Sequence, residues 1–418
     1  MMKKVLILSH QGAGLIEKLV ASVKELEFDY HILSSNVANL EDALTRWETP
    51  AQQVTVVEES DLNWDNCASL LAELNCDFSI SIWEGYRLLM AQINQHLGCD
   101  DISPAAIELI QDKSKLRALM QEKRLSQVER FTVEQALAFP KEVFENNKHV
   151  AKPRRGIGSL SVSILNSYQD LLDAIDEFNR MSEYPLYKSY HQDNELFIEQ
   201  YIDGKEFSFE MLVANSEVKL FQEHEKLVVT ETEDTVLENV FLSPSIMLSR
   251  IEIEKAKTLL EKTLKLVGAH TGCFHIEMKY TSRLQWELIE INPRVGGMFV
   301  PESVNLISDK CLILSWLQIL AGIEIETAQP AEDTYAYFEI EYADNGKKIA
   351  DYQQNTSYPT PDEERIYLPV GSTAEGEKMA IFACQYFWQA NKAKLDKILS
   401  SAANKKFIEI KYTEAEPA

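Results

Sequence analysis

The stretch that most constrains this sequence runs from residue 273 to residue 297, CFHIEMKYTSRLQWELIEINPRVGG. Its alternating apolar residues predict two neighbouring strands, Cys273–Lys279 and Trp286–Ile291, around a polar turn. Because side chains in a strand alternate between faces, three polar side chains of the first strand are expected on one face. They are His275, Glu277 and Lys279. The stretch therefore predicts a sheet with one apolar face and one face that carries polar and charged side chains.

The end of the second predicted strand carries the block Glu290-Ile-Asn292-Pro-Arg294-x-Gly-Gly. Glu290 and Asn292 share a face, and Glu277 precedes Glu290 by thirteen residues. Two carboxylates and an amide oxygen form the hard-oxygen set that Mg²⁺ prefers. An arginine just beyond them suits a phosphoryl or carboxylate oxygen, because its donors bind in pairs. For Glu277 alone, a solvated strand face explains the charge equally well, but the whole block favours a metal site.

A second segment, VAKPRRGIGSLSV, spans residues 150–162. Lys152 stands at a predicted strand end, and Gly156 and Gly158 follow in a loop that could place backbone N–H groups on phosphates. No Gly-Lys-Ser/Thr ends the loop, so it is not a Walker A motif. Taken alone, a flexible surface loop with a lysine is the better explanation.

A third segment, FIEQYIDGKEFSFE, covers residues 197–210. Its alternation predicts strands, and the backbone of the first could face the edge of an adenine ring. Glu199 and Glu206 are spaced to accept hydrogen bonds from an exocyclic amine and a ribose hydroxyl. The alternative is an acidic hairpin without a ligand.

The whole chain is expected to form about three domains, because it has 418 residues and a domain has roughly 150. Residues 1–105 alternate strand and helix patterns, which indicates a Rossmann-like open α/β domain. Residues 106–195 would form a linker helix and a small mobile lid, and residues 196–418 a large domain. At its C-terminal end we expect β-hairpins, including Tyr335–Tyr342 and Lys348–Tyr352 around Asp344-Asn345-Gly346. The first glycine pair, Gly12-x-Gly14, is followed by Glu17, so the dinucleotide fingerprint is incomplete.

The net charge is 41 − 66 = −25, which argues against a nucleic-acid-binding surface. The six cysteines form no CxxC pair and no zinc spacing with histidine, which is typical of free thiols in a reducing compartment. The apolar run after MMKK is too short for a signal peptide, and no stretch is long enough for a membrane span. We therefore expect a cytoplasmic protein without membrane partners.

The motifs, taken in order, resemble the ATP-grasp superfamily of carboxylate–amine ligases, over roughly residues 1–330. The order is Asp112-Lys113, Lys152 with its glycine loop, Glu199-Gln200-Tyr-Ile202 followed by Gly204-x-Glu206, Glu277, and Glu290-x-Asn292-x-Arg294. Within it the chain is most similar to the L-amino acid ligase group, which joins amino acids into dipeptides. Three segments carry this similarity: Ser81-Ile-Trp-Glu84-Gly, Gly272-Cys-Phe-His275-Ile-Glu277 and Arg294-x-Gly-Gly-Met298.

The resemblance implies an α/β protein of ATP-grasp fold, with an α+β nucleotide-binding part, that uses ATP and two Mg²⁺ ions, with Mn²⁺ as a substitute. It implies three kinds of site residue. Those for ATP are Lys113, Lys152, Gly156, Gly158, Ser159, Glu199, Gln200, Ile202 and Glu206. Those for the metals are Glu277, Glu290 and Asn292. Those for the acid and amine substrates are Glu84, His275, Arg294, Gly296, Gly297 and Met298, with Arg294, Lys152 and Gly297 as catalytic groups.

The expected reaction activates a carboxylate as an acyl phosphate, which an amine attacks to give an amide, ADP and phosphate. Its partners are small-molecule acids and amines, with a homodimer as a further expectation. Two alternatives stay open: a ligase for a non-peptide acid, and a non-catalytic ATP-binding module. The chain departs from the family at Ser161, where the loop usually has a glycine, and at Phe241, where many relatives have a histidine.

Overall fold

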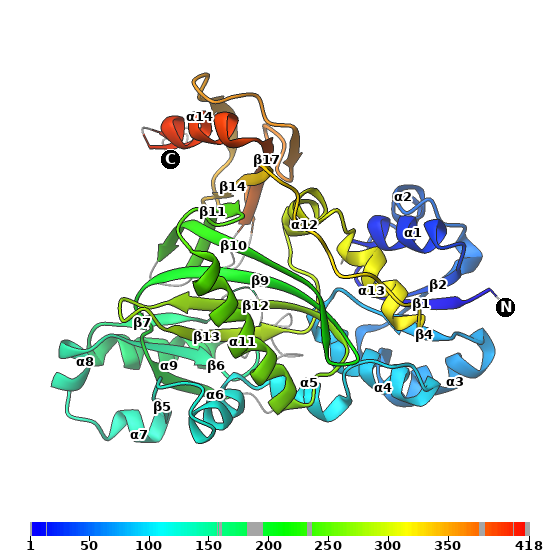
Figure 1. The fold of residues 1–418 in the computed structure, drawn as a ribbon, viewed down its shortest axis with the longest axis horizontal. Helices are drawn as coiled ribbons and strands as arrows, with labels where there is room; N and C mark the ends of the chain where they lie inside the picture. Colours follow the sequence, from blue (N-terminus) through cyan, green and yellow to red (C-terminus); the bar gives the residue numbers. More distant parts are fainter. Residues whose placement is uncertain are drawn as a thin grey trace, which may run out of the picture.

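The structure is a computed structural model that describes residues 2–13, 15–156, 158, 161–181, 195–231, 236–375, 381–403 and 405–413. It contains an N-terminal α/β domain, a small four-stranded sheet, and a large sheet that continues into the C-terminal region (Figure 1). Among the described residues, none of the helices combines the length and the apolar character needed to cross a membrane.

The N-terminal domain is a parallel sheet of order β3-β2-β1-β4 flanked by helices. Its strands are β1 (Lys4–His10), β2 (Asp29–Ser35), β3 (Val54–Val57) and β4 (Phe78–Ile80). Its helices are α1 (Ile16–Glu25), α2 (Leu40–Arg46), α3 (Trp64–Leu74) and α4 (Arg87–Leu97). The run from Val5 to Leu8 is fully buried, because helices cover both faces of the sheet. The predicted open α/β domain is confirmed.

The second part contains the sheet β5-β8-β6-β7 and the helices before and around it. Its strands are β5 (Arg130–Thr132), β6 (His149–Pro153), β7 (Ser163–Leu165) and β8 (Leu196–Gln200). Its helices are α5 (Pro104–Gln111), α6 (Lys113–Glu122), α7 (Val133–Leu137), α8 (Glu142–Asn146) and α9 (Tyr168–Met181). Helix α9 begins at a capping box, in which the Ser167 and Asp170 side chains each accept the other's backbone N–H. Because β8 lies on this sheet, the small unit extends past residue 195.

The large sheet has eight strands in the order β13-β12-β9-β10-β11-β14-β17-β16. These are β9 (Lys205–Ala214), β10 (Glu217–Glu231), β11 (Val236–Ser243), β12 (Gly272–Tyr280), β13 (Trp286–Asn292), β14 (Tyr335–Ala343), β16 (Glu363–Ile366) and β17 (Ile381–Ala390). Helix α11 (Arg250–Val267) crosses one face, as Figure 1 shows. That face is apolar, since Phe207, Phe209, Phe274 and Ile276 form one buried cluster with residues of α5, α6 and α11.

Two helices connect the large sheet to the N-terminal domain. Helix α12 (Val300–Ser308) and helix α13 (Leu312–Leu320) follow directly after the Glu290–Gly297 block. Both share a core cluster with the first strands of the chain, and Trp316 and Leu317 are fully buried in it. The end of the predicted metal block is therefore fixed between two domains.

The C-terminal region differs from the prediction. Strand β14 pairs with β11 and β17, and β15 (Ile349–Gln354) pairs with β18 (Ile408–Tyr412), so the predicted hairpin between β14 and β15 is wrong. Both edges of β14 are already occupied in the large sheet. After the turn, the backbone bonds instead to residues 371–374, through the Gly346 N–H to Ala374 O at 2.7 Å and the Ile349 N–H to Ser372 O at 2.9 Å. Helix α14 (Lys392–Ala402) packs beside these strands.

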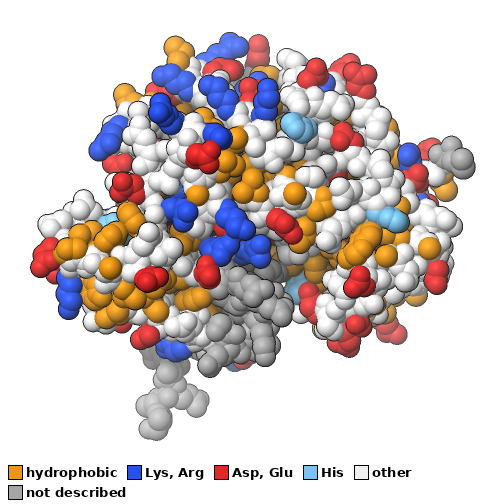
Figure 2. All heavy atoms as spheres, turned by 90° about the horizontal axis from the view of Figure 1, so that it is seen from below, with side chains coloured by type: hydrophobic (Ala, Val, Ile, Leu, Met, Phe, Trp, Pro, Cys, Tyr) orange, Lys and Arg blue, Asp and Glu red, His pale blue; other side chains and the backbone are white. Residues whose placement is uncertain are grey.

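Although the net charge is −25, positive side chains gather locally on the surface (Figure 2). Figure 2 shows one face on which Lys and Arg side chains gather in groups, with acidic side chains between them. Local groups of cations of this kind are compatible with binding a small anion, even on an acidic chain.

Candidate active site

The second face of the large sheet is a continuous polar floor. In antiparallel pairing, directly opposed residues share a face, and Glu290 opposes Glu277, which opposes Ser208. In the next row, Asn292 opposes His275, which opposes Glu210. The prediction that the polar side chains of the 273–279 strand share a face is confirmed, and the register extends that face across β9 and β13.

A cleft lies between this floor and the small sheet. It encloses about 910 Å³, counting its mouth. Nine residues predicted for ATP or metal line it: Lys113, Lys152, Gly156, Gly158, Glu199, Ile202, Glu206, Glu277 and Glu290. Apolar side chains of both sheets complete it, including Val150, Ile164 and Ile289. An apolar wall beside converging charged groups is the usual composition of a small-molecule site.

Lys113 connects the glycine loop to the floor of the cleft. Its Nζ donates to the Gly156 carbonyl at 2.9 Å and lies 3.2 Å from Glu290 Oε2. Burial alone would lower the pKa of Lys113, but Glu290 and Glu84 raise it. At the base of the loop, Arg154 pairs with Asp112, whose side chain caps α6. The loop, the helix α6 and the Glu290–Gly297 block therefore meet at the ammonium group of Lys113.

Lys152 and Glu199 form a buried ion pair on neighbouring strands β6 and β8. Glu199 also accepts from Arg117 Nε at 3.1 Å, so both carboxylate oxygens face cations. Burial lowers the pKa of Lys152, and Glu199 offsets only part of this effect. A carboxylate has further lone pairs, so the predicted contact with an adenine amine stays a prediction. The structure adds a second role for Glu199, as the counter-ion of Lys152.

The predicted metal ligands lie on the paired strands β12 and β13, where Glu277 opposes Glu290, but other groups of the chain contact them. Asn292 Nδ2 donates to Glu290 Oε1 at 2.9 Å, and Lys226 Nζ lies 3.3 Å from Glu277 Oε2. Burial alone would raise the pKa of Glu277, but Lys226 and His275 hold it well below its usual range. Two ionised or ionisable carboxylates and an amide oxygen fit the ligand preference of Mg²⁺. The metal assignment stays a prediction.

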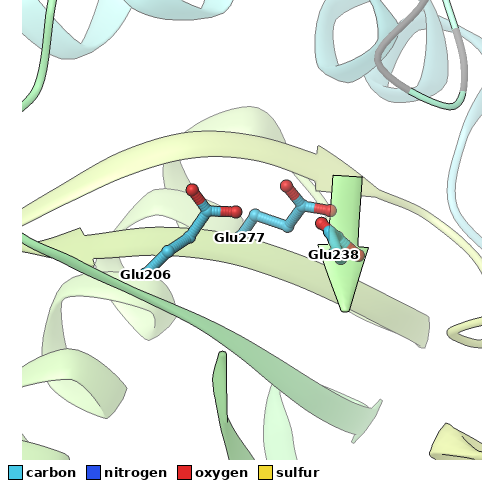
Figure 3. A group of neighbouring side chains, drawn as sticks. All are labelled: Glu206, Glu238 and Glu277. Carbon is cyan, nitrogen blue, oxygen red and sulfur yellow. The ribbon is translucent and has the colours of Figure 1, made fainter. Parts of the chain in front are cut away.

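A different acidic cluster surrounds Lys226. Figure 3 shows Glu206, Glu238 and Glu277, whose carboxylate oxygens lie within 4.8 Å of one another. Lys226 Nζ bonds Glu206 at 2.6 Å, pairs with Glu238, and is fully buried. Because all three carboxylates already contact the ammonium group of Lys226, this cluster encloses a buried lysine. It shares only Glu277 with the predicted metal set.

His275 and Glu210 form a buried pair beside the Gly296 backbone. Burial alone would lower the pKa of His275, but Glu210 and Glu277 raise it to about 10. Glu210 Oε2 also accepts the Gly296 N–H at 3.2 Å. Because this N–H bonds Glu210, it is not available to the substrate for which Gly296 and Gly297 are both predicted.

Arg294 faces the N-terminal domain. Its Nη2 lies 3.1 Å from Glu84 Oε2, and its Nη1 donates to the Val295 carbonyl at 3.0 Å. Burial raises the pKa of Glu84, and Arg294 offsets part of that rise. Beside them, Arg87 of α4 donates to the Pro293 carbonyl at 2.5 Å. Glu84 and Arg294 were both predicted at the substrate, and the structure brings them into contact.

The remaining predictions concern Gly297, Met298, Gln200, Ser159 and Phe241. Gly297 and Met298 lie at the turn before α12, where Gly297 is exposed and Met298 is partly buried. Gln200 is exposed and does not line the cleft, whereas Ile202, two residues further along the chain, does. Ser159 lies outside the described residues. Phe241, at the position of the relatives' histidine, stacks on Phe338 in the core with centroids 4.7 Å apart.

Sequence reasoning missed several members of the site. Glu210 could have been found, because it continues the alternation of Glu206 and Ser208 along one strand. Lys226 and Glu238 lie on β10 and β11, and no motif in the sequence marks them. Arg117 lies inside the amphipathic helix α6, where a lone arginine gives no sign of a buried partner.

Comparisons with known proteins concern the family and the fold of the chain. Residues 146–302 match the family described as ATP-grasp domain. The L-amino acid ligase from Bacillus licheniformis has a similar structure, with a TM-score of 0.79 at 16% identity, covering 99% of each chain. Phosphoribosylglycinamide synthetase from Anaerococcus prevotii gives a TM-score of 0.67 at 17% identity, covering 99% of this chain and 100% of that one. No curated protein matched the sequence.

A third similar structure contains a nucleotide. The biotin carboxylase domain of Hydrogenobacter thermophilus 2-oxoglutarate carboxylase, in complex with MgADP, ADP and bicarbonate, gives a TM-score of 0.71 at 17% identity. The alignment covers 99% of this chain and 92% of that one. Residues 146–302 therefore match the ATP-grasp domain family, and the whole chain shares the fold of these structures. The predicted superfamily and fold class are confirmed, and the roles of the individual residues stay predictions.

Proposed function

We propose that the chain is an ATP-dependent ligase that joins the carboxylate of one amino acid to the amine of another, with release of ADP and phosphate. The observation that carries the proposal is the continuity of the polar floor. Its one end, at Lys113 and Glu290, opens into the cleft, and its other end reaches the Arg294–Glu84 pair. A nucleotide bound in the cleft would direct its last phosphate toward the acid end.

The nucleotide end supplies positive charge for phosphates. Lys113 and Lys152 line the cleft together with the loop residues Gly156 and Gly158. Mg²⁺ held by Glu277, Glu290 and Asn292 would offset phosphate charge and polarise the phosphoryl group. We propose two such ions, with Mn²⁺ as a substitute. The structure with MgADP among similar proteins supports a magnesium nucleotide.

The acid end would hold a carboxylate for activation. Arg294 can offer a carboxylate two parallel donors, and the Gly297 N–H is near it in the chain. Attack of the carboxylate oxygen on the γ-phosphorus breaks the bond to ADP and gives an acyl phosphate. The amine nitrogen then attacks the carbonyl carbon, loses a proton and displaces phosphate. Donors aimed at the oxyanion of that step typically contribute about 3–4 kcal/mol.

Glu84 is placed to recognise the amino group of the first amino acid. Its carboxylate is buried and already bonds Arg294, so an ammonium group beside it would complete a zwitterion-binding pair. The similarity to an L-amino acid ligase supports this substrate class. Met298 would border the side chain of that amino acid, and a flexible thioether suits a moderately large apolar group.

Pairwise screening of the twenty amino acids for ADP and phosphate release tests the proposal, with mass spectrometry to identify the amide. Phosphate release that needs both an amino acid and a second amine, with a dipeptide as product, supports it. Release that needs a non-peptide acid would assign the chain to another ligase of the same fold. Nucleotide binding without turnover of any acid would indicate a non-catalytic module.

A further inference from the structure

A cation from the C-terminal strands reaches the turn that follows Arg294. Arg365, on β16, donates from Nη1 to the Met298 carbonyl at 3.0 Å. Its guanidinium lies 3.9 Å from the centroid of the Phe299 ring. Through Nη2 it also pairs with Glu302, in the first turn of α12. One side chain thus holds three successive parts of the segment that carries Gly297 and Met298.

The backbone at this turn requires such support. Met298 has φ 58°, in the left-handed region that residues with a Cβ rarely adopt. Conformations of this kind persist only where the surroundings fix them, and they are concentrated at functional sites. The Met298 carbonyl bonds Arg365, and the next residue, Phe299, is buried with its ring 5.1 Å from that of Phe387. The strained residue is therefore held by contacts at its own carbonyl and at the residue that follows it.

The same contact reaches the N-terminal domain. The carboxylate oxygen of Glu302 that pairs with Arg365 also pairs with Lys18 of α1. Figure 1 shows α12 between the N-terminal domain and the C-terminal strands. Arg365, Glu302 and Lys18 therefore form a three-residue bridge around the turn at the acid end of the floor.

We propose that Arg365 is a positioning residue, which sets the 296–299 turn so that Gly297 and Met298 meet the acid substrate. The proposal rests on the proposed function for the identity of that substrate. The described contacts of Arg365 are with the turn and α12, not with the cleft, whose lining comes from the small sheet and the floor. Its removal should affect acid handling and leave nucleotide binding unchanged.

Three variants of the full chain test this. Arg365→Ala removes every contact, and Arg365→Lys keeps a charge for Glu302 but loses the planar group that lies on Phe299 while donating to Met298. Lys394→Ala is the matched control, because Lys394 pairs with Asp362 at 2.7 Å in the same C-terminal region without touching the turn. If Arg365→Ala does not fold, Arg365→Lys carries the test.

The first measurement needs no substrate. Hydrogen exchange at the Val300 amide, which donates to the Gly297 carbonyl at 3.1 Å, reports the closure of the turn. We expect exchange about tenfold faster in both Arg365 variants, as loss of a single hydrogen bond implies, and unchanged exchange in Lys394→Ala. Equal exchange in all three variants would overturn the positioning role.

The second measurement uses phosphate release with a mixture of the twenty amino acids. In the Arg365 variants we expect KM for the mixture to rise about tenfold and ATP affinity to change less than about twofold. Millimolar guanidinium chloride should restore much of the activity of Arg365→Ala, because the side chain is 25% exposed and its place is open to solvent. An equal loss of ATP affinity, or normal KM, would overturn the proposal.

The two proposals fail separately. If the unmodified protein releases no phosphate with any acid, the proposed function is wrong, and hydrogen exchange alone then decides the role of Arg365. If the unmodified protein turns over and the variants match it, the proposed function stands and the role of Arg365 is wrong.

Discussion

Replacement of Gly296 by alanine is expected to damage the site, because the added methyl group would meet closely packed neighbours. A Cβ at this position would lie 2.7 Å from Val300 Cγ1, 2.8 Å from His275 Nδ1 and 2.9 Å from Glu210 Oε1. Two of these neighbours are polar atoms of a buried ion pair, which cannot retreat without losing each other. The neighbouring Gly297 is the natural control, since a Cβ there meets nothing within 4 Å.

The magnitude follows from two costs. Forcing an extra methyl group into a packed interior costs about 1–3 kcal/mol. If the backbone shifts to make room, the Gly296 N–H loses its bond to the Glu210 carboxylate at 3.2 Å, which costs about 1.5–3 kcal/mol more. The two costs overlap, so we expect a loss of roughly 2–5 kcal/mol in the unit that contains the floor. Gly297→Ala should stay within about 0.5 kcal/mol of the original chain.

Thermal unfolding of the two variants is the assay, followed by phosphate release well below both midpoints. At roughly 2–4 °C per kcal/mol, the midpoint of Gly296→Ala should fall by about 4–20 °C, and that of Gly297→Ala should hardly move. Turnover of Gly296→Ala should drop as well, because the same methyl group displaces Glu210 and His275 next to Glu277. Equal midpoints and equal turnover for both variants would refute the packing described for Gly296.

Three further changes test the charged groups. Glu290→Gln should abolish ATP turnover without unfolding the chain, and normal turnover at ordinary Mg²⁺ concentration would remove Glu290 from the metal site. Arg294→Lys keeps the charge but loses the paired donors, so amide formation should fall about thirty- to several-hundred-fold with little change in ATP dissociation; a collapse of ATP binding with normal residual chemistry would make Arg294 a nucleotide ligand. Lys226→Met leaves three carboxylates without their buried cation, so the unfolding midpoint should fall at neutral pH. The double variant Lys226→Met/Glu238→Gln should recover part of this loss. Additive losses would show that Lys226 and Glu238 do not stabilise each other.

The sequence predicted those parts of the fold that follow from local patterns. Period-two alternation placed His275, Glu277 and Lys279 on one face, and the observed register agrees. It failed where pairing depends on distant strands. The turn at Gly346 predicts a hairpin between β14 and β15. Both edges of β14 are instead paired with β11 and β17, which are far from it in the sequence. A turn motif specifies a change of direction, but the competition for strand edges decides the partner.

The site shows the same limit in a different form. Residue types and their order were sufficient to place nine predicted residues around one cleft. They were not sufficient to show that Lys226 lies among Glu206, Glu238 and Glu277, since those contacts join four strands. Spacing along the chain reports which residues share a strand face. Which of them touch depends on register and on bulges such as the one between Glu277 and Met278.

The charged groups of the site explain why sequence motifs alone do not assign their roles. Each predicted acid already lies against a cation of the same chain: Glu84 with Arg294, Glu199 with Lys152, Glu206 and Glu277 with Lys226, and Glu290 with Lys113. Burying an unpaired charge costs several kcal/mol, so such acids and cations must be paired to be compatible with a folded chain. A metal ion would need these carboxylates, and a phosphate would need these cations. Each ligand would therefore replace the partner that the side chain has in the folded chain. The carboxylates and cations that bind a magnesium nucleotide are therefore the same residue types that pair with one another in the folded chain. A change in turnover on substitution distinguishes a residue that binds the nucleotide or the metal from one that only balances a charge.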